Sequence, residues 1–233
     1  MSKSPLRILL AWSVHTFTAS GAVLGLLSIF AIQQHDWRQA FIWMALAVIV
    51  DGLDGWLARL AQVKTYAPGL DGALMDNLID YVTYVLVPAL FLYEAELVPP
   101  AYAIPAGAMI MLTSAYQFSQ TNAKTEDHFF LGFPSYWNFA VAYLLILNWN
   151  PWVNLAFLAL LGMLIFAPIK YIYPSRTRAH QRLTIIVTYT WAAITLAGLL
   201  QYPDIPAWLI PLTWVYAAYY IGMSLWAGRT HTT

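Results

Sequence analysis

Four aspartates of this 233-residue chain have a residue type and a spacing that could do chemistry. Asp51 and Asp54 follow the apolar run FIWMALAVIV three residues apart, and Asp76 and Asp80 precede YVTYVLVPALFL four residues apart. Residues at these spacings lie on one face of a helix. Because a carboxylate at membrane depth costs about 2.5–3.5 kcal/mol to insert, four of them require positive counter-charge.

The segment between the two pairs, LARLAQVKTYAPGLDG, contains Pro68 and Gly69 and is typical of a short turn. Two antiparallel helices joined there would bring the pairs together. Hard divalent cations, Mg²⁺ or Mn²⁺, are the expected counter-ions of such an all-oxygen site. Two ions about 3.5–4 Å apart would make a phosphoryl-transfer centre. Asp71 is instead predicted to cap the following helix, and the alternative that all the aspartates cap helix ends beside water stays open.

The elements that must hold these side chains are membrane helices. The chain is 61% hydrophobic and 9% charged, whereas soluble domains carry about 25% charged residues. Its net charge of +0 does not suggest a nucleic-acid partner, and the absence of cysteine excludes disulfides and thiolate metal ligands. We expect an all-α polytopic membrane bundle of about eight transmembrane helices, forming a single domain over residues 1–233. The expected spans are 8–32, 38–60, 72–95, 101–118, 135–149, 152–172, 183–201 and 208–227.

The basic residues predict the orientation of this bundle. With the N-terminus in the cytoplasm, ten of the eleven lysines and arginines fall in cytoplasmic segments and only Arg38 falls outside. Both termini and the aspartates are therefore expected at the cytoplasmic face. A cleaved signal peptide is disfavoured because the first apolar stretch continues to Ile32.

Residues 51–80, DGLDGWLARLAQVKTYAPGLDGALMDNLID, resemble the signature of the CDP-alcohol phosphatidyltransferase family, D-x2-D-G-x2-A-R-x(n)-G-x3-D-x3-D. The spacer between Arg and the second Gly has twelve residues, longer than in most members. In this the chain is similar to the bacterial branch that joins CDP-diacylglycerol to free choline. The stretches VHTFTASGAVLGLL, DYVTYVLVPA, TEDHFFLGFPSYWN and IKYIYPSRT resemble that branch as well. The fixed positions of the signature are filled by Asp51, Asp54, Gly55, Ala58, Arg59, Gly72, Asp76 and Asp80.

The resemblance implies a role for each aspartate of the signature. Asp51, Asp54 and Asp76 would hold two divalent cations, Mn²⁺ or Mg²⁺. Asp80 would lie at the same metal site and act as the general base on the acceptor hydroxyl. The division has a chemical reason, because metal-bound carboxylates are poor bases and a freer one must take the proton.

The resemblance also implies a site for the nucleotide and its diphosphate. Gly55 and Gly72 would allow the helices and the nucleotide to approach closely, with Ala58 on the same crowded face. Ordinary small-residue helix packing is the alternative. Arg59 would bind phosphate oxygens, unless it is an interfacial residue that snorkels. Thr18 occupies a position where the family has a Thr near the nucleotide, although His15 replaces the Asn usual three residues before it.

The acceptor that the resemblance implies, choline, carries a quaternary ammonium group that donates no hydrogen bonds. Aromatic faces would therefore recognise it by cation–π attraction, unless these aromatic residues belong to an interfacial belt. The candidates are Tyr81, Tyr84, Tyr136 and Trp137, next to Asn138, with Glu126 or Asp127 to supply negative charge. In the loop KYIYPSRTRAHQR, Arg176 and Arg178 are candidates for lipid phosphate, and positive-inside bias is the alternative reason for their presence.

The expected reaction is therefore two-metal phosphoryl transfer from CDP-diacylglycerol to choline, with release of CMP, in the bacterial inner membrane. Besides these substrates, membrane lipids are the expected partners, and a homodimer stays open. One alternative is a family member with serine, inositol or glycerol phosphate as acceptor. An alternative of another class is a transporter whose intramembrane carboxylates carry ions, although no internal repeat is evident.

Overall fold

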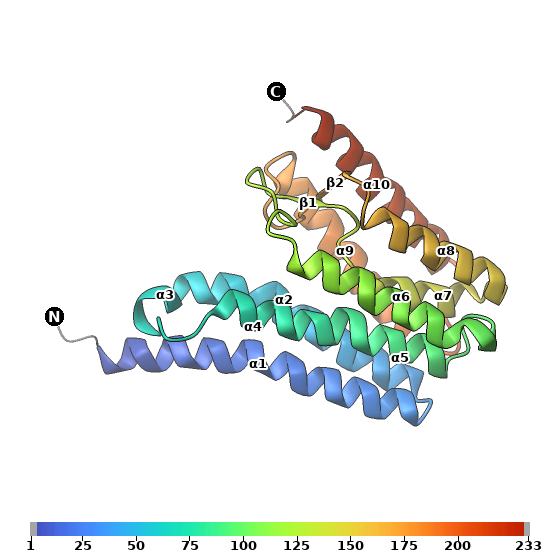
Figure 1. The fold of residues 1–233 in the computed structure, drawn as a ribbon, viewed down its shortest axis with the longest axis horizontal. Coiled ribbons are helices and arrows are strands. Elements are labelled where there is room, and N and C mark those ends of the chain that lie inside the picture. Colours follow the sequence, from blue (N-terminus) through green and yellow to red (C-terminus); the bar gives the residue numbers. More distant parts are fainter. Residues whose placement is uncertain (1–3, 231–233) are drawn as a thin grey trace.

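The computed structural model describes residues 4–230 and consists almost entirely of helices (Figure 1). The elements in chain order are α1 (Pro5–Gln33), α2 (Trp37–Leu60), the short α3 (Val63–Tyr66), α4 (Gly72–Asp80), the π-helical segment η1 (Tyr81–Leu86), α5 (Val87–Glu94), α6 (Pro100–Ser119), β1 (Phe129–Leu131), α7 (Trp137–Leu147), α8 (Pro151–Leu164), β2 (Lys170–Ile172), α9 (Gln181–Leu199) and α10 (Leu209–Thr230).

The predicted pair of helices around the aspartates is present and packs against the first helix. α1, α2 and the continuous segment α4–η1–α5 lie side by side along the length of the molecule (Figure 1). At Gly21 a Cβ would lie 2.7 Å from Cγ2 of Ile79, so glycine allows α1 to approach α4 this closely. Asp71 caps α4 as predicted, because its carboxylate accepts hydrogen bonds from the amides of Ala73 at 3.0 Å and Leu74 at 3.1 Å.

Four helices within the described residues are long and apolar enough to cross a membrane, namely α1, α2, the segment Gly72–Glu94 and α9. Between 22% and 39% of their apolar windows is buried inside the protein, so most of this surface faces outward, as lipid contact requires. α7 and α8 are also apolar but have 11 and 14 residues. At about 1.5 Å per residue they extend roughly 17 and 21 Å, less than the ~30 Å hydrocarbon layer.

The expectation of an all-α fold is wrong in one respect. β1 and β2 form a two-stranded antiparallel sheet in which Phe130 pairs with Tyr171. The expected span 152–172 is too long for the same reason, since α8 ends at Leu164 and its last predicted residues belong to β2. Pro168 lies in the connection, and proline disfavours a helical conformation in the residue before it.

The main apolar core lies among α2, α5, α6, α7 and α8 and includes the fully buried Phe91, Ile110, Trp137 and Leu158. A second, small cluster under the sheet consists of Phe129, Ile172 and Ala227. The amide of Ile172 also donates to Ser224 Oγ at 3.0 Å. The sheet is thereby attached to α10.

Candidate active site

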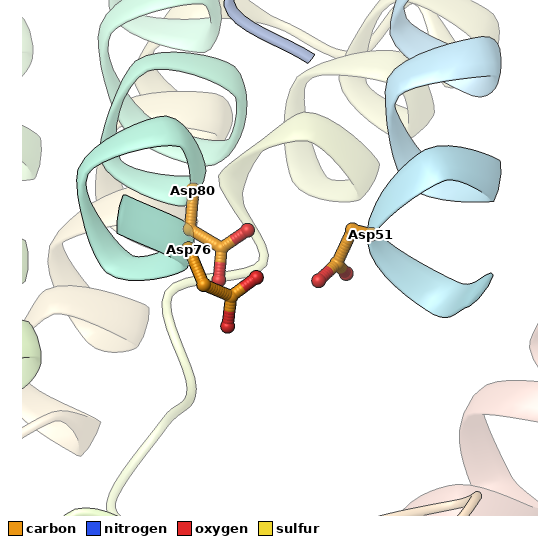
Figure 2. Close-up of side chains that lie close together, drawn as sticks. All are labelled: Asp51, Asp76 and Asp80. Atoms are coloured by element: carbon orange, nitrogen blue, oxygen red, sulfur yellow. The ribbon is translucent and has the colours of Figure 1, made fainter. Parts of the chain in front are cut away.

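The two aspartate pairs converge across the gap between α2 and α4. Asp51 projects from α2 toward Asp76 and Asp80, which project from α4 (Figure 2). One carboxylate oxygen of each lies within 4.8 Å of those of the other two. The predicted meeting of the pairs is therefore confirmed for these three residues. Asp54, 7% exposed, lines the same cavity.

The carboxylates have little counter-charge from the protein. Within residues 4–230 the only ion pair shorter than 4.0 Å joins Lys170 to Asp127, at 2.7 Å. Lys124, in the segment before β1, is the cation whose charge acts on the carboxylates of all three clustered aspartates. One lysine cannot neutralise three carboxylates. The cluster offers hard oxygen donors close together, and it could hold a divalent cation.

Neighbouring hydroxyl groups complete the surroundings of the cluster. The phenol of Tyr84 donates a hydrogen bond of 2.8 Å to Oδ2 of Asp51. Thr18 and Thr83 line the cavity with the aspartates, and each donates its hydroxyl hydrogen to the backbone carbonyl four residues earlier. Their hydroxyl oxygens keep only lone pairs for a further hydrogen bond. The cavity volume available to the centre of a water molecule is ≈ 10 Å³, about enough for one water or ion.

Gly72 has a neighbour that the sequence did not predict. A Cβ at this position would lie 3.2 Å from Cε1 of His15, so the glycine makes room for the imidazole. His15 is 6% exposed, and its Nε2 has no hydrogen-bond partner among the described residues. Its ring lies edge-on to Trp12, with 5.9 Å between centroids.

Gly55, by contrast, faces charged groups. Its Cβ position lies 3.6 Å from Nη1 of Arg59 and 3.9 Å from Nη2 of Arg176. Ala58 is half-buried one turn further along α2. Arg178 is exposed, and none of its atoms lies within 4 Å of the Gly55 Cβ position. Of the two arginines proposed for lipid phosphate, only Arg176 therefore lies within 4 Å of the Gly55 Cβ position.

Two of the predicted aromatic candidates lie beside the carboxylates. The rings of Tyr84 and Tyr136 contact each other with 6.0 Å between centroids. Tyr136 also meets Phe130 edge-on at 6.1 Å, and Phe130 stacks on Tyr173 at 4.5 Å. The sequence analysis did not name Phe130 or Tyr173 as acceptor-binding candidates. Both lie in segments that resemble the family, TEDHFFLG and IKYIYPS, and this resemblance could have indicated them.

Other acceptor candidates have different partners. Tyr81 donates its hydroxyl to the carbonyl of Met111 at 2.9 Å. Trp137 is fully buried in the core and donates its indole N–H to Ser114 Oγ at 2.7 Å. Glu126 is exposed and forms no ion pair within 4.0 Å in the described part of the chain. Tyr81 and Trp137 therefore form hydrogen bonds away from the carboxylates, and an acceptor role for any of the three stays a prediction.

The carboxylate of Asp127 forms an ion pair with Lys170 of β2. Desolvation raises the pKa of its carboxyl, but hydrogen bonds from Lys170 and Thr125 outweigh this and hold the pKa below its usual value. Lys170 also lies 5.5 Å from the centre of the Phe129 ring. This ion pair therefore supports the pairing of β1 with β2.

Comparison with known proteins identifies the family. Residues 13–169, more than half of the chain, match the family described as CDP-alcohol phosphatidyltransferase. The chain belongs to this family. The matched region contains the complete aspartate signature, so the resemblance seen in the sequence is confirmed. A CDP-alcohol phosphatidyltransferase is an enzyme, and the convergent carboxylates lie where the signature predicts its site.

Bacterial members of the family resemble the chain over most of its length. The phosphatidylcholine synthase of Legionella pneumophila is 43% identical over 223 residues, covering 93% of this chain and 88% of that protein. That of Pseudomonas aeruginosa is 38% identical, covering 97% of this chain and 95% of that protein. That of Borreliella burgdorferi is 40% identical, covering 78% of each.

Proposed function

We propose that this enzyme transfers the phosphatidyl group of CDP-diacylglycerol to choline, forming phosphatidylcholine and releasing CMP. The observation that carries the proposal is the convergence of Asp51, Asp76 and Asp80 in a chain that is similar, over more than nine-tenths of its length, to two bacterial phosphatidylcholine synthases. Such a set of carboxylates suits phosphoryl transfer, because the reaction needs positive charge beside a diphosphate and a base beside the attacking hydroxyl.

We assign to the aspartates the roles that the family signature implies. Asp51, Asp54 and Asp76 hold the metal site, and the hydrogen bond from Tyr84 fixes the orientation of Asp51. Two divalent cations, Mg²⁺ or Mn²⁺, supply Lewis-acid stabilisation of the diphosphate when bound there. Asp80 accepts the proton of the choline hydroxyl. The hydroxyl oxygen then forms a bond to the phosphorus nearer diacylglycerol, the bond from that phosphorus to the CMP oxygen breaks, and CMP leaves with the electron pair.

Choline binds, in this proposal, against the aromatic group formed by Tyr84, Tyr136, Phe130 and Tyr173. These rings touch in sequence, from the residue bonded to Asp51 outward to the sheet. Aromatic faces attract a trimethylammonium group without hydrogen bonds, and the nearby carboxylates favour its charge. The hydroxyl end of choline would then point toward Asp80.

A comparison of acceptors tests this function. Purified enzyme with CDP-diacylglycerol and a divalent cation is offered choline, ethanolamine, serine, inositol or glycerol phosphate, and CMP release is measured. We expect choline to be used fastest, because an aromatic surface leaves the hydrated donors of ethanolamine unsatisfied. Faster turnover with serine, inositol or glycerol phosphate would contradict the choice of acceptor while leaving the family assignment intact.

We also propose that the chain is one membrane domain of about eight spans in a bacterial inner membrane, with both termini and the active site on the cytoplasmic side. The basic residues of the sequence support this orientation. The chain has no cysteine, so single cysteines can be labelled without background. An impermeant maleimide added to intact cells should label Glu96→Cys but not Gly69→Cys, and the reverse pattern would overturn the orientation.

A further inference from the structure

Two arginines from distant parts of the chain meet at Gly55, the residue after Asp54 in the signature. Arg59 lies in the last turn of α2, whereas Arg176 lies in the turn after β2. Nη1 of Arg59 and Nη2 of Arg176 lie 3.6 Å and 3.9 Å from the same point, the Cβ position of Gly55. The two nitrogens can therefore be no more than 7.5 Å apart, the sum of these distances. Gly55 directly follows Asp54, whose side chain lines the carboxylate cavity.

Neither guanidinium is neutralised by the protein. In the part of the chain that the structure describes, no carboxylate lies within 4.0 Å of either one. Two like charges this close repel each other, and their convergence is favourable only when an anion lies between them or beside them. Both side chains are exposed, so a ligand can reach them.

The turn that carries Arg176 is firmly attached to the sheet. The Arg176 amide donates to the carbonyl of Tyr173 at 2.9 Å, and the guanidinium lies 5.5 Å from the centre of the Tyr173 ring. Thr177 Oγ1 accepts from the Tyr173 amide at 2.7 Å and donates to the carbonyl of His128 at 2.6 Å. The direction of Arg176 toward Gly55 is thus set by hydrogen bonds to the segment before β1.

We propose that Arg176 is a substrate-binding residue that, together with Arg59, holds the diphosphate of the CDP-activated lipid. This inference rests on the proposed function. A diphosphate offers several anionic oxygens, which suit two planar guanidinium groups. The arginines would hold anionic oxygens of the diphosphate near Gly55, next to Asp54, which lines the carboxylate cavity. Arg176 takes part in no bond-making step, and it positions the diphosphate for attack by choline.

The test compares Arg176→Gln with Arg182→Gln. Arg182 is an exposed arginine at the start of α9, and none of its atoms lies within 4 Å of the Gly55 Cβ position. Arg176→Gln should raise the KM for CDP-diacylglycerol about tenfold, which is 1.4 kcal/mol, and leave the KM for choline nearly unchanged. Arg182→Gln should match the wild type in both constants. Arg176→Lys keeps the positive charge but loses the planar guanidinium. Its KM for CDP-diacylglycerol should lie between that of the wild type and that of Arg176→Gln.

A binding measurement separates the diphosphate from other anions. CDP and CMP are titrated, with a divalent cation present, into wild-type and variant enzyme that have the same melting temperature. The wild type should bind CDP more tightly than CMP, and Arg176→Gln should lose most of this preference. Wild-type CDP affinity in Arg176→Gln would overturn the inference, as would an equal loss in Arg182→Gln. If CDP affinity is normal but activity responds to phosphatidylglycerol in nanodiscs, Arg176 binds a bulk lipid headgroup and the inference is wrong.

The two proposals can fail separately. If wild-type enzyme releases no CMP with choline, the proposed acceptor is wrong, but the loss of CDP preference in Arg176→Gln still supports the diphosphate site. If choline is consumed and the CDP preference is unchanged, the proposed function stands and the role of Arg176 is refuted.

Discussion

The hydrogen bond between Tyr84 and Asp51 gives the sharpest prediction about the metal site. The phenol donates to a clustered carboxylate at 2.8 Å, and Tyr84 is 6% exposed. A hydrogen bond to a charged group contributes about 1.5–3 kcal/mol, and 1.4 kcal/mol corresponds to tenfold. Loss of a partner that orients a metal ligand typically lowers metal affinity about 10- to 100-fold. Both arguments place the effect of Tyr84→Phe at one to two orders of magnitude.

The assay is CMP release as a function of Mn²⁺ concentration, with both substrates saturating. Tyr84→Phe should raise the half-saturating Mn²⁺ concentration about 10- to 100-fold. The choline KM should change little, because the aromatic face is kept.

Tyr81→Phe is the matched control, since it removes the same hydroxyl from the same segment, where it bonds the carbonyl of Met111. It should leave the metal dependence unchanged. Wild-type Mn²⁺ dependence in Tyr84→Phe would refute the reasoning, as would an equal shift in both variants.

Three further predictions concern the same site. Excess EDTA should stop turnover and added Mn²⁺ or Mg²⁺ should restore it, because the clustered carboxylates have little counter-charge from the protein; full turnover in EDTA would contradict a metal site. Asp80→Asn should abolish CMP release while CDP binding is largely kept. Asp76→Asn should instead weaken both CMP release and CDP binding. An Asp80→Asn enzyme that keeps most of its kcat would show that the base is another residue. Phe130→Leu should raise the choline KM roughly thirtyfold if a cation–π face of about 2 kcal/mol is lost, with an unchanged KM for CDP-diacylglycerol; normal choline kinetics would place the acceptor pocket elsewhere.

The carboxylates could be predicted from the sequence because helical periodicity is a local property. Spacings of three and four place each aspartate pair on one helix face whatever surrounds the helix. The insertion cost of a charge among apolar residues then leaves few explanations other than counter-ions. The cap formed by Asp71 was predictable for the same reason, since the amides that it accepts from lie within three residues of it.

The aromatic group was only partly predictable. Tyr84 follows Asp80 by one helical turn, so its proximity to the site is local. Phe130 and Tyr173 stack only because β1 pairs with β2, and strands of three residues are too short to show a periodic pattern. Trp137 resembled a site residue in sequence, but its indole N–H bonds to Ser114 in a different helix.

The sequence alone therefore determined the membrane class, the family and the carboxylates that converge. Composition, apolar run length and helical spacing are each readable along the chain, and each has a direct energetic meaning in a bilayer. Only the tertiary structure decided which arginine of the loop reaches Gly55 and which residue occupies the space at Gly72. Those contacts join segments that are distant in the chain, and they depend on how the sheet and α1 pack rather than on any local pattern.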